Sequence, residues 1–519
     1  MNKPFTEATI EQILFYSCLL VSVLAVVLNP SNPTLDGPAH LYNAHNINYI
    51  LGGNEFIGHF YALNKIPVAN LTDHYLLALF MSVFSWQIAE KLLIVLYLLS
   101  FSILFRKLIS QWKEANIRMS IFAIPFSFSF LYYIGFYNFC LSFPLLFGML
   151  IYFRKHFSGE GNGPSGRNYF ILSLLATLIY FTNGLAFMFA GLVLFLMALP
   201  TLYSNKKVHL KRLFLFILVW LPGGICFLIF LLKVTIEPGT SIVPFHELLR
   251  WIYTARPLIV FTSEEDKFTQ LIALLVAVAM CAAIYFRLKK RAKFKLYKSD
   301  LFFLLAIITL SFFLTIRDGA SVGMMSIRLC YYFFIFLILW ISLQKGSKTI
   351  TWVCSVGLVV LHFTLLFKSH QPEISKYNEQ LEQVTNAGKV IKPNSIVLAA
   401  DVTDNFLLFH FPDYLGIDKP LVIIGNYETN YGWFATVWNN YKMPRILLDG
   451  RDSVPPNLNI HWKASNETKT VDYVFVYGYY TNFQQRDDWN GLNGILQKDY
   501  KLIYTSDNNY IHIFGLQAD

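Results

Sequence analysis

At 519 residues, with 55% hydrophobic and only 14% charged residues, this chain is more apolar than a soluble protein, because soluble domains average about 45–50% apolar and about 25% charged residues. The mean hydropathy of +0.46 agrees, and disordered, fibrous and ordinary cytosolic classes are excluded. The net charge of +10 does not indicate nucleic-acid binding, because residues 1–367 carry 29 basic and 15 acidic residues whereas residues 368–519 carry 13 and 17. The basic excess belongs to the apolar part, where it sets membrane orientation.

Eleven apolar runs are long enough, or nearly so, to cross a hydrocarbon core of about 30 Å as helices. These runs predict an α-helical multi-pass membrane protein. They lie near residues 13–29, 88–105, 119–134, 136–153, 168–182, 184–203, 213–232, 268–288, 300–316, 325–344 and 349–367. A twelfth run at 74–86 is too short to cross, and it predicts a helix that lies at the membrane surface or re-enters it.

The charges between the runs predict the orientation of the chain. With the N-terminus in the cytoplasm and residues 74–86 not crossing, the cytoplasmic segments hold 21 Lys and Arg, and the outer segments of the membrane part hold 8. Such a basic excess is typical of cytoplasmic loops. We therefore expect residues 30–87, and everything after residue 367, on the outer face of a bacterial inner membrane.

The first outer loop begins with PTLDGPAHLYNAHNINYILGG (33–53), which predicts a helix. Asp36 stands where that helix begins, Pro38 is tolerated in a first turn, and Gly52 and Gly53 mark the end. His40 follows Asp36 by one helical turn, so the two side chains are neighbours on one face. From these residues alone, Asp36 is either a helix cap or a functional carboxylate.

Other polar residues of this loop are weaker candidates. His45, His59 and His74 raise the question of a metal site, but their spacing matches no standard ligand set, and solvated histidines at the membrane surface are the expectation. Glu55 and Asp73 are expected to be solvated loop residues in the same way.

Two stretches carry a resemblance to a known family: LDGPAHLYNA (35–44) and NLTDHYLLALFMSVFSWQIAEKLLIVLYLLSFSILFRK (70–107). A span, an outer loop with an early Asp, a surface helix, a short apolar helix and a second span ending in basic residues resemble the GT-C superfamily of polyprenyl-phosphate-dependent glycosyltransferases. Protein O-mannosyltransferases and the aminoarabinose transferases of lipid A are relatives of this kind. The resemblance implies transfer of a sugar from a polyprenyl-phosphate carrier to an extracytoplasmic lipid, glycan or protein, with inversion and with Asp36 as the base.

The resemblance has one departure that concerns metals. The mannosyltransferases have an acidic pair at this place, whereas Asp36 is followed by Gly37. No second Asp that would complete a metal site is identifiable. A reaction without metal or other cofactor is therefore expected, and the question of a divalent ion is left open. His40 is expected to orient Asp36 or to contact a sugar hydroxyl.

Transfer from a phosphate carrier also needs cations for the leaving group and polar groups for the sugar. Arg328 stands just inside the outer end of a predicted span, where a charge is costly unless it is paired, functional or snorkelling, and Arg317 lies nearby. We take both as candidate phosphate-binding residues. Candidate sugar or acceptor contacts are Asn138 and Asn183 in two short outer turns, and Glu428 in the aromatic segment 425–434.

The C-terminal segment 368–519 differs from the membrane part, 1–367. Short β-type runs bounded by turn residues, such as SIVLAAD, PLVIIGN and VDYVFVYG, alternate with a helical stretch, SKYNEQLEQVTNAG. This pattern predicts a small extracytoplasmic α/β domain.

Two other functions stay open from the sequence. A lipid or solute transporter or flippase would favour ionisable residues at mid-span and paired half-repeats, and neither is evident. A non-catalytic membrane assembly factor with an outer domain would need no acidic base. Membrane lipids are expected partners in every case, and nucleic acid is not.

Overall fold

The computed structural model describes residues 6–113, 115–157, 164–204, 207–234, 241–289, 298–318, 323–403, 405–430, 432–439, 471–479 and 490–517. Residues 158–163 and 290–297, in two of the loops predicted to be cytoplasmic, and Tyr431 of the aromatic segment lie outside these ranges. The chain forms two compact units. The first, here the helical unit, comprises Met1–Asn29 and Ile94–Glu373, and the second, here the sheet unit, comprises Pro30–Leu93 and Ile374–Asp519.

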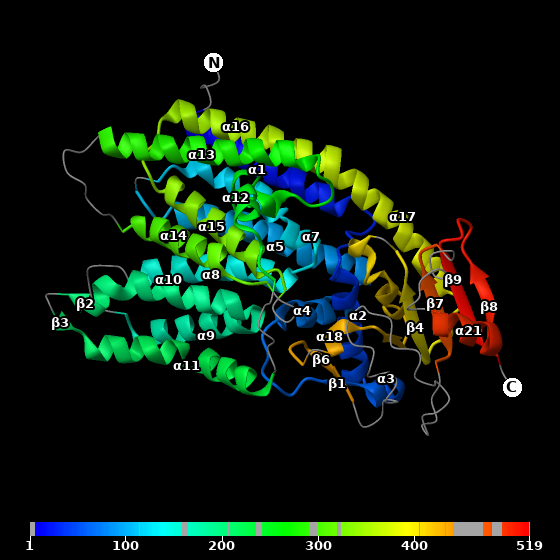
Figure 1. Cartoon of the computed structure of the whole chain (residues 1–519). Coiled ribbons are helices and arrows are strands. Elements are labelled where there is room, and N and C mark those ends of the chain that lie inside the picture. The colour runs from blue at the N-terminus through cyan, green and yellow to red at the C-terminus, as the bar shows by residue number, and fades with distance from the viewer. Residues whose placement is uncertain are drawn as a thin grey trace, which may run out of the picture. The chain divides into compact units, whose positions relative to one another are not determined.

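The helical unit consists of long apolar helices that run alongside one another (Figure 1). Helix α13 packs along α16, α14 along α15, and α9 along α11. The helices are α1 (Glu7–Val27), α5 (Trp86–Ile109, from Ile94 on), α8 (Tyr137–Phe157), α9 (Gly166–Thr182), α10 (Gly184–Leu202), α11 (Leu210–Lys233), α12 (Phe245–Tyr253), α13 (Glu265–Lys289), α14 (Asp300–Thr315), α15 (Met325–Ser342) and α16 (Lys348–Leu365). A small hairpin, β2 (Tyr203–Ser204) and β3 (Lys207–Val208), joins α10 to α11.

The predicted membrane character is confirmed. Within the described ranges, eight helices are long and apolar enough to cross a membrane. Every one of the eleven predicted runs is helical, but α9, α14 and the stretch 117–133 are shorter than a full span. The number of crossings is therefore approximate.

The run at 119–134 does not form the single straight helix that its composition predicts. It is divided into η1 (Ile117–Phe122), α6 (Ala123–Ser127) and α7 (Phe130–Tyr133). Pro125 lies in the first turn of α6, where a residue without an N–H is tolerated, whereas in the interior of a continuous helix it would remove a hydrogen bond. The Ser127 hydroxyl bonds back to the Ile124 carbonyl at the point where α6 ends.

Two ion pairs lie among the helices of the helical unit. Arg106 donates to both carboxylate oxygens of Glu11, with Nη2 to Oε2 at 2.7 Å, and its guanidinium lies over the Phe15 ring. Arg287 forms an ion pair with Asp300. Such pairing is what the low-dielectric interior requires, because an unpaired buried charge is costly.

The sheet unit contains a five-stranded sheet with strand order β5-β4-β7-β9-β8. The central strand pairs β4–β5 and β4–β7 are parallel, and β7–β9 and β9–β8 are antiparallel. The strands are β4 (Ser395–Asp401), β5 (Leu421–Ile424), β7 (Tyr473–Tyr477), β8 (Tyr500–Thr505) and β9 (Ile511–Leu516), with helices α17 (Gln371–Gly388) and α21 (Asn490–Asp499). The predicted α/β domain is confirmed, including the helix expected at 375–388.

The first loop of the chain folds with this sheet. It contributes α2 (Gly37–Leu51), α3 (Glu55–Phe60), β1 (Tyr61–Leu63) and α4 (Thr72–Met81) to the sheet unit. Strand β1 pairs antiparallel with β6 (Thr436–Trp438), and the rings of Tyr61 and Trp438 stack at 4.4 Å. At ten residues, α4 is about 15 Å long, which agrees with the prediction that 74–86 is too short to cross.

Tyr42 attaches α2 to the edge strand β5. Its hydroxyl donates to the Leu421 carbonyl at 2.7 Å and accepts from the Ile423 amide at 3.1 Å. Its ring lies so close to Gly416 that a Cβ on that glycine would be 2.4 Å from the ring. The helix that begins at Asp36 is therefore held in a fixed register against the sheet.

Candidate active site

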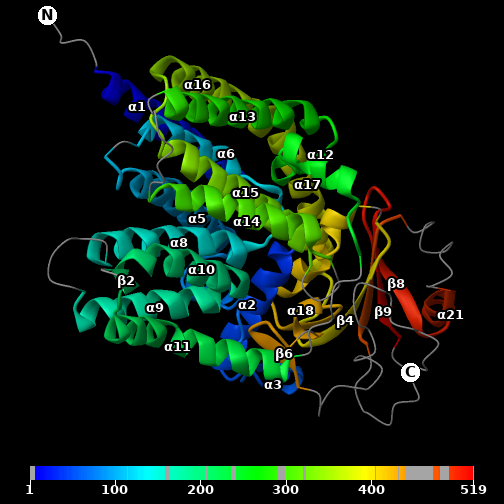
Figure 2. The ribbon, with the colours of Figure 1, turned by 60° about the vertical axis from the view of Figure 1, so that its left-hand side comes forward.

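Helix α2 presents a polar face to the interior of the sheet unit. Asp36, His40 and Asn43 follow one another at helical spacing and are all buried, with Asp36 8% exposed. Figure 2 shows α2 beside α18 (Tyr427–Asn430) and β6, and α4 packs against α2. Polar residues from α2, α4 and α18 therefore meet in one place.

His40, Asp73, His74 and Glu428 form a cluster, which we call the His–carboxylate cluster. His40 Nδ1 lies 2.8 Å from Glu428 Oε1 and 3.3 Å from His74 Nε2. His74 Nε2 lies 2.7 Å from Glu428 Oε2, and His74 Nδ1 lies 2.6 Å from Asp73 Oδ1. The side chains of Asp73, His74 and Glu428 are fully buried, and that of His40 is 5% exposed.

Amide groups surround the cluster and fix Glu428. The Asn43 amide donates to Glu428 Oε2 at 2.6 Å and to Asn426 Oδ1 at 3.0 Å. Asn43 Oδ1 in turn accepts from Asn426 Nδ2 and from the Thr436 hydroxyl. The carboxylate of Glu428 is thus positioned by partners from α2 and α4, and Asn426 and Thr436 in turn hold the Asn43 amide.

The cluster carries matched charges. Burial alone would lower the pKa of His40, but the carboxylates of Asp73 and Glu428 outweigh it and raise the pKa to about 9. The pKa of His74 is raised well above its usual value for the same reason. Burial alone would raise the pKa of Glu428, and the charges of His74 and His40 instead hold it well below its usual range. Asp73 behaves likewise.

Asp36 lies at the N-cap of α2 but does not cap it with its side chain. The Gly37 amide instead donates to the Thr34 hydroxyl at 3.0 Å. The Asp36 carboxylate faces the hydroxyl of Tyr427 and lies 3.6 Å from His410 Nε2, and the rings of His410 and Tyr427 stack at 4.4 Å. Burial lowers the pKa of His410 to about 4, so this ring is neutral near pH 7.

The same cluster offers metal ligands. One ligand atom from each of His40, Asp73 and His74 can be chosen so that all lie within 4.8 Å of one another. Imidazole nitrogens with carboxylate oxygens suit zinc and related divalent ions.

The other predicted residues lie in the helical unit. Arg328 is in the first turns of α15, with its guanidinium 4.3 Å from the Phe136 ring and 5.7 Å from the Phe139 ring. Asn138, which stands between these phenylalanines in the sequence, is 5% exposed in the first turn of α8. Asn183 caps α10 by accepting from the Ala186 amide. Arg317 is exposed in the segment between α14 and α15.

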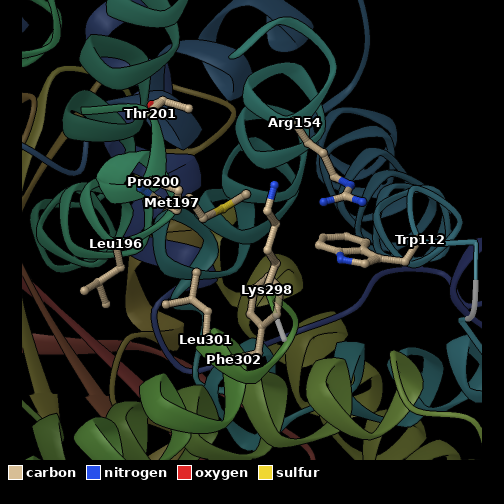
Figure 3. A pocket seen from close by; sticks show the side chains of 9 residues that line it. All are labelled: Trp112, Arg154, Leu196, Met197, Pro200, Thr201, Lys298, Leu301 and Phe302. Atoms are coloured by element: carbon tan, nitrogen blue, oxygen red, sulfur yellow. The ribbon is translucent and has the colours of Figure 1, made fainter. Parts of the chain in front are cut away.

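A pocket with a volume of about 170 Å³ lies in the helical unit. Figure 3 shows the Arg154 guanidinium and the Lys298 ammonium turned toward the same space beside Trp112. The remaining wall is mostly apolar, with Leu196, Met197, Pro200, Leu301 and Phe302. We call it the Arg154–Lys298 pocket.

No family model matches the sequence, and no curated protein matches it. The structure aligns with the crystal structure of ArnT from Cupriavidus metallidurans bound to undecaprenyl phosphate, over 98% of both chains, with a TM-score of 0.54 and 10% identity. The chain shares the fold of ArnT. The apo state of that ArnT aligns over the same shares with a TM-score of 0.48 and 10% identity. The alignment with the undecaprenyl-phosphate-bound ArnT confirms the predicted fold, a multi-pass helical membrane part with a C-terminal α/β domain.

Two expectations about the first loop are wrong. Asp73 and His74 were expected to be solvated, but both are fully buried, because α4 packs against α2 and brings them to Glu428. Glu55 is exposed as expected.

Sequence reasoning also missed the residues that surround these two. They are Asn43, Asn426, His410 and Tyr427. The spacing of Asp36, His40 and Asn43 on one helical face was a usable signal for Asn43. The residues from the C-terminal segment had no such signal, because the tertiary fold alone brings them to α2.

Proposed function

We propose that this protein is an integral membrane glycosyltransferase that moves a sugar from a polyprenyl-phosphate carrier to an acceptor outside the cytoplasm. The fold shared with ArnT, which was crystallised with undecaprenyl phosphate, supports this function. The single observation that carries it is the buried carboxylate of Asp36, which stands at the start of a helix without capping it. A buried carboxylate that lies 3.6 Å from the neutral His410 ring can accept a proton.

In the proposed reaction, the acceptor hydroxyl attacks the anomeric carbon from the face opposite the phosphate. Its proton passes to Asp36 as the new C–O bond forms. The bond between the anomeric carbon and the phosphate oxygen breaks, and polyprenyl phosphate leaves with both bonding electrons. The configuration at the anomeric carbon is inverted. Tyr427, whose hydroxyl lies beside Asp36, is proposed to orient the carboxylate.

The remaining roles are assigned by chemistry. Arg328 and Arg317 are proposed to hold the carrier phosphate, because guanidinium–phosphate contacts stabilise the charge that develops on the leaving group. Asn138 and Asn183 are proposed sugar contacts. His40 Nδ1 is engaged by Glu428, so a contact from His40 to a sugar hydroxyl would use Nε2. Glu428 is proposed to act by holding His40 rather than by touching the acceptor.

The proposed orientation places the N-terminus in the cytoplasm and the sheet unit outside. Single cysteines at Lys107 and Glu379, which are both exposed, test it in a background without reactive native thiols. A membrane-impermeant reagent added to spheroplasts should label the residue-379 cysteine and not the residue-107 cysteine. Labelling of both positions from the same side would contradict this topology.

Asp36→Asn tests the catalytic role. This variant keeps the shape of the side chain and removes its basicity, so turnover should fall by about 10²–10⁴-fold with little change in thermal stability. Glu55→Gln is the matched control, because Glu55 also stands at the start of a short helix but is exposed. Full activity of the Asp36→Asn protein on its true acceptor would reject Asp36 as the base.

A further inference from the structure

We propose that His40, His74 and Glu428 bind a divalent transition-metal ion of the zinc class, with Asp73 as the carboxylate that orients His74. The inference concerns the sheet unit alone, and it goes beyond the proposed transfer reaction. The sequence pointed away from a metal because Gly37 follows Asp36, but the proposed ligands come from α2, α4 and α18 instead.

The two imidazoles are arranged as ligands of one ion. At metal–nitrogen distances of about 2.0–2.1 Å, two nitrogens of a tetrahedral zinc site lie about 3.3 Å apart. His40 Nδ1 and His74 Nε2 face each other at 3.3 Å. Glu428 places one oxygen near each nitrogen, at 2.8 and 2.7 Å, so its carboxylate borders the same point in space.

Asp73 supplies the outer support that metal-binding histidines have. A ligating histidine almost always donates its other ring N–H to a carboxylate or a carbonyl, which fixes the ring. Asp73 Oδ1 lies 2.6 Å from His74 Nδ1, so the Nε2 atom of His74 is directed at His40 and Glu428. The two carboxylates together carry the charge that balances one divalent cation.

The donor set selects the class of metal. Two nitrogens and carboxylate oxygen suit zinc and its first-row neighbours, whereas magnesium and calcium favour oxygen ligands. Such an ion would tie the first turns of α2 and α4 to α18 and so fix the helix that begins at Asp36.

Metal content measures the proposal directly. The full-length protein, purified in detergent without chelator from cells grown with zinc, should hold close to one zinc-class ion per chain. His74→Gln should reduce the content at least tenfold, and His246→Gln, at an exposed histidine of the helical unit, should leave it unchanged.

A second measurement does not depend on a variant that folds. Chelation of the wild-type protein should lower its melting temperature, and zinc chloride alone should restore it. Absence of bound metal together with no response to added zinc would show that the cluster is a metal-free network of ion pairs. Since neither measurement uses turnover, this failure would leave the proposed transferase activity standing.

A different observation supports a second inference, about the Arg154–Lys298 pocket. No acidic side chain of the described chain lines this pocket, although its two cations point into it (Figure 3). Arg154 donates to the Gln111 carbonyl and stacks on Trp112 at 3.7 Å. The Trp112 indole N–H is buried without a hydrogen-bond partner. The two cations thus share a space that no acidic side chain of the described residues lines.

We infer that the pocket binds the phosphate group of an anionic membrane lipid. Basic pockets between membrane helices bind lipid head groups, and the wall of Leu196, Met197, Leu301 and Phe302 suits the start of an acyl chain. The volume is below the roughly 300–1,000 Å³ of pockets that enclose a whole small molecule. A head group with its chains outside fits this space.

Thermal shift in detergent separates a lipid from free phosphate. Phosphatidylglycerol should raise the melting temperature, whereas phosphatidylcholine and inorganic phosphate should not. The shift should disappear in Arg154→Gln and Lys298→Gln and persist in Lys107→Gln, at an exposed lysine outside the pocket. An equal shift with inorganic phosphate would reassign the pocket to a free anion, and an unchanged lipid shift in both variants would overturn the inference.

Discussion

The His–carboxylate cluster and the Arg154–Lys298 pocket differ in the balance of their positive and negative side chains. In the cluster, two imidazoles and two carboxylates are buried together, and every charge has a counter-charge within hydrogen-bonding distance. In the pocket, two cations share a space that no described carboxylate lines. The comparison shows how the charge balance of a group of buried side chains indicates its role. Side chains whose charges balance can stabilise the fold or exchange their protons for a cation. Cations without a nearby carboxylate can bind an anion.

The largest effect should follow from unbalancing the cluster. Glu428→Gln leaves His40 and His74 buried without their shared carboxylate, and breaking a buried ion pair in this way costs about 3–5 kcal/mol. The free energy of unfolding of the sheet unit, followed by proteolysis or chemical denaturation, measures the loss. Glu379→Gln, an exposed change in the same unit, should be close to neutral. A Glu428→Gln protein of wild-type stability would show that the cluster holds no net charge pair.

A slightly smaller effect should come from the balanced pair of the helical unit. Glu11→Gln leaves Arg106 buried and should cost about 3 kcal/mol. The double change Glu11→Leu with Arg106→Met should recover most of this loss, because an apolar pair of similar volume replaces both charges. Melting temperatures of the three proteins in detergent form the comparison. If the double variant is less stable than the single one, the pair contributes net attraction rather than balance.

Arg328 differs from both the cluster and the pocket, because its guanidinium lies over an aromatic ring near the start of a membrane helix. If it holds the carrier phosphate, Arg328→Met should weaken binding of undecaprenyl phosphate by about 1.5–3 kcal/mol, the size of one charge-assisted contact. Arg250→Met, at an exposed arginine paired with Asp266, is the control. Unchanged affinity in a folded Arg328→Met protein would return this arginine to a snorkelling role.

The smallest effect concerns His45, whose pKa is shifted by burial and not by a neighbouring carboxylate. Burial lowers the pKa of His45 to about 4, in contrast to His40. Its native pKa is below its unfolded value near 6.5, so its contribution to stability is complete above pH 6.5 and is lost as the pH falls toward 4. The loss should be about 1 kcal/mol at pH 5.5. His45→Gln should flatten the stability profile between pH 7.5 and 5.5, and an equally steep profile in that variant would assign it to other groups.

Much of the fold could be predicted because it rests on local patterns. The apolar runs, the short helix near 74–86 and the strands at 395–401 and 473–477 each follow from composition over a few residues. The divided helix at 117–133 shows the limit, since apolar composition predicts one span there, whereas the segment forms three short helices with Pro125 in the first turn of α6. The start of α2 at Asp36 was predictable from its turn residues.

The site was predictable only on its α2 side. Asp36 and His40 share one helix, so spacing relates them. Glu428 reaches His40 from 388 positions further along the chain, and nothing in local spacing pairs it with Asp73 or His74. Only the packing of α4 against α2 brings these residues together. Because local sequence does not show that packing, the sequence alone predicted that Asp73 would be solvated.

The pairing of the first loop with β5 and β6 has a consequence for biosynthesis. Tyr42 bonds to Leu421, 379 residues later, and β1 finds its partner strand only at Thr436. At about 5–20 residues per second, the ribosome needs roughly 20–75 seconds to deliver those partners. During that interval the first loop emerges with its polar helix face uncovered. The C-terminal third is therefore not a detachable module, and a chain truncated before residue 421 should expose this loop to chaperones and proteases.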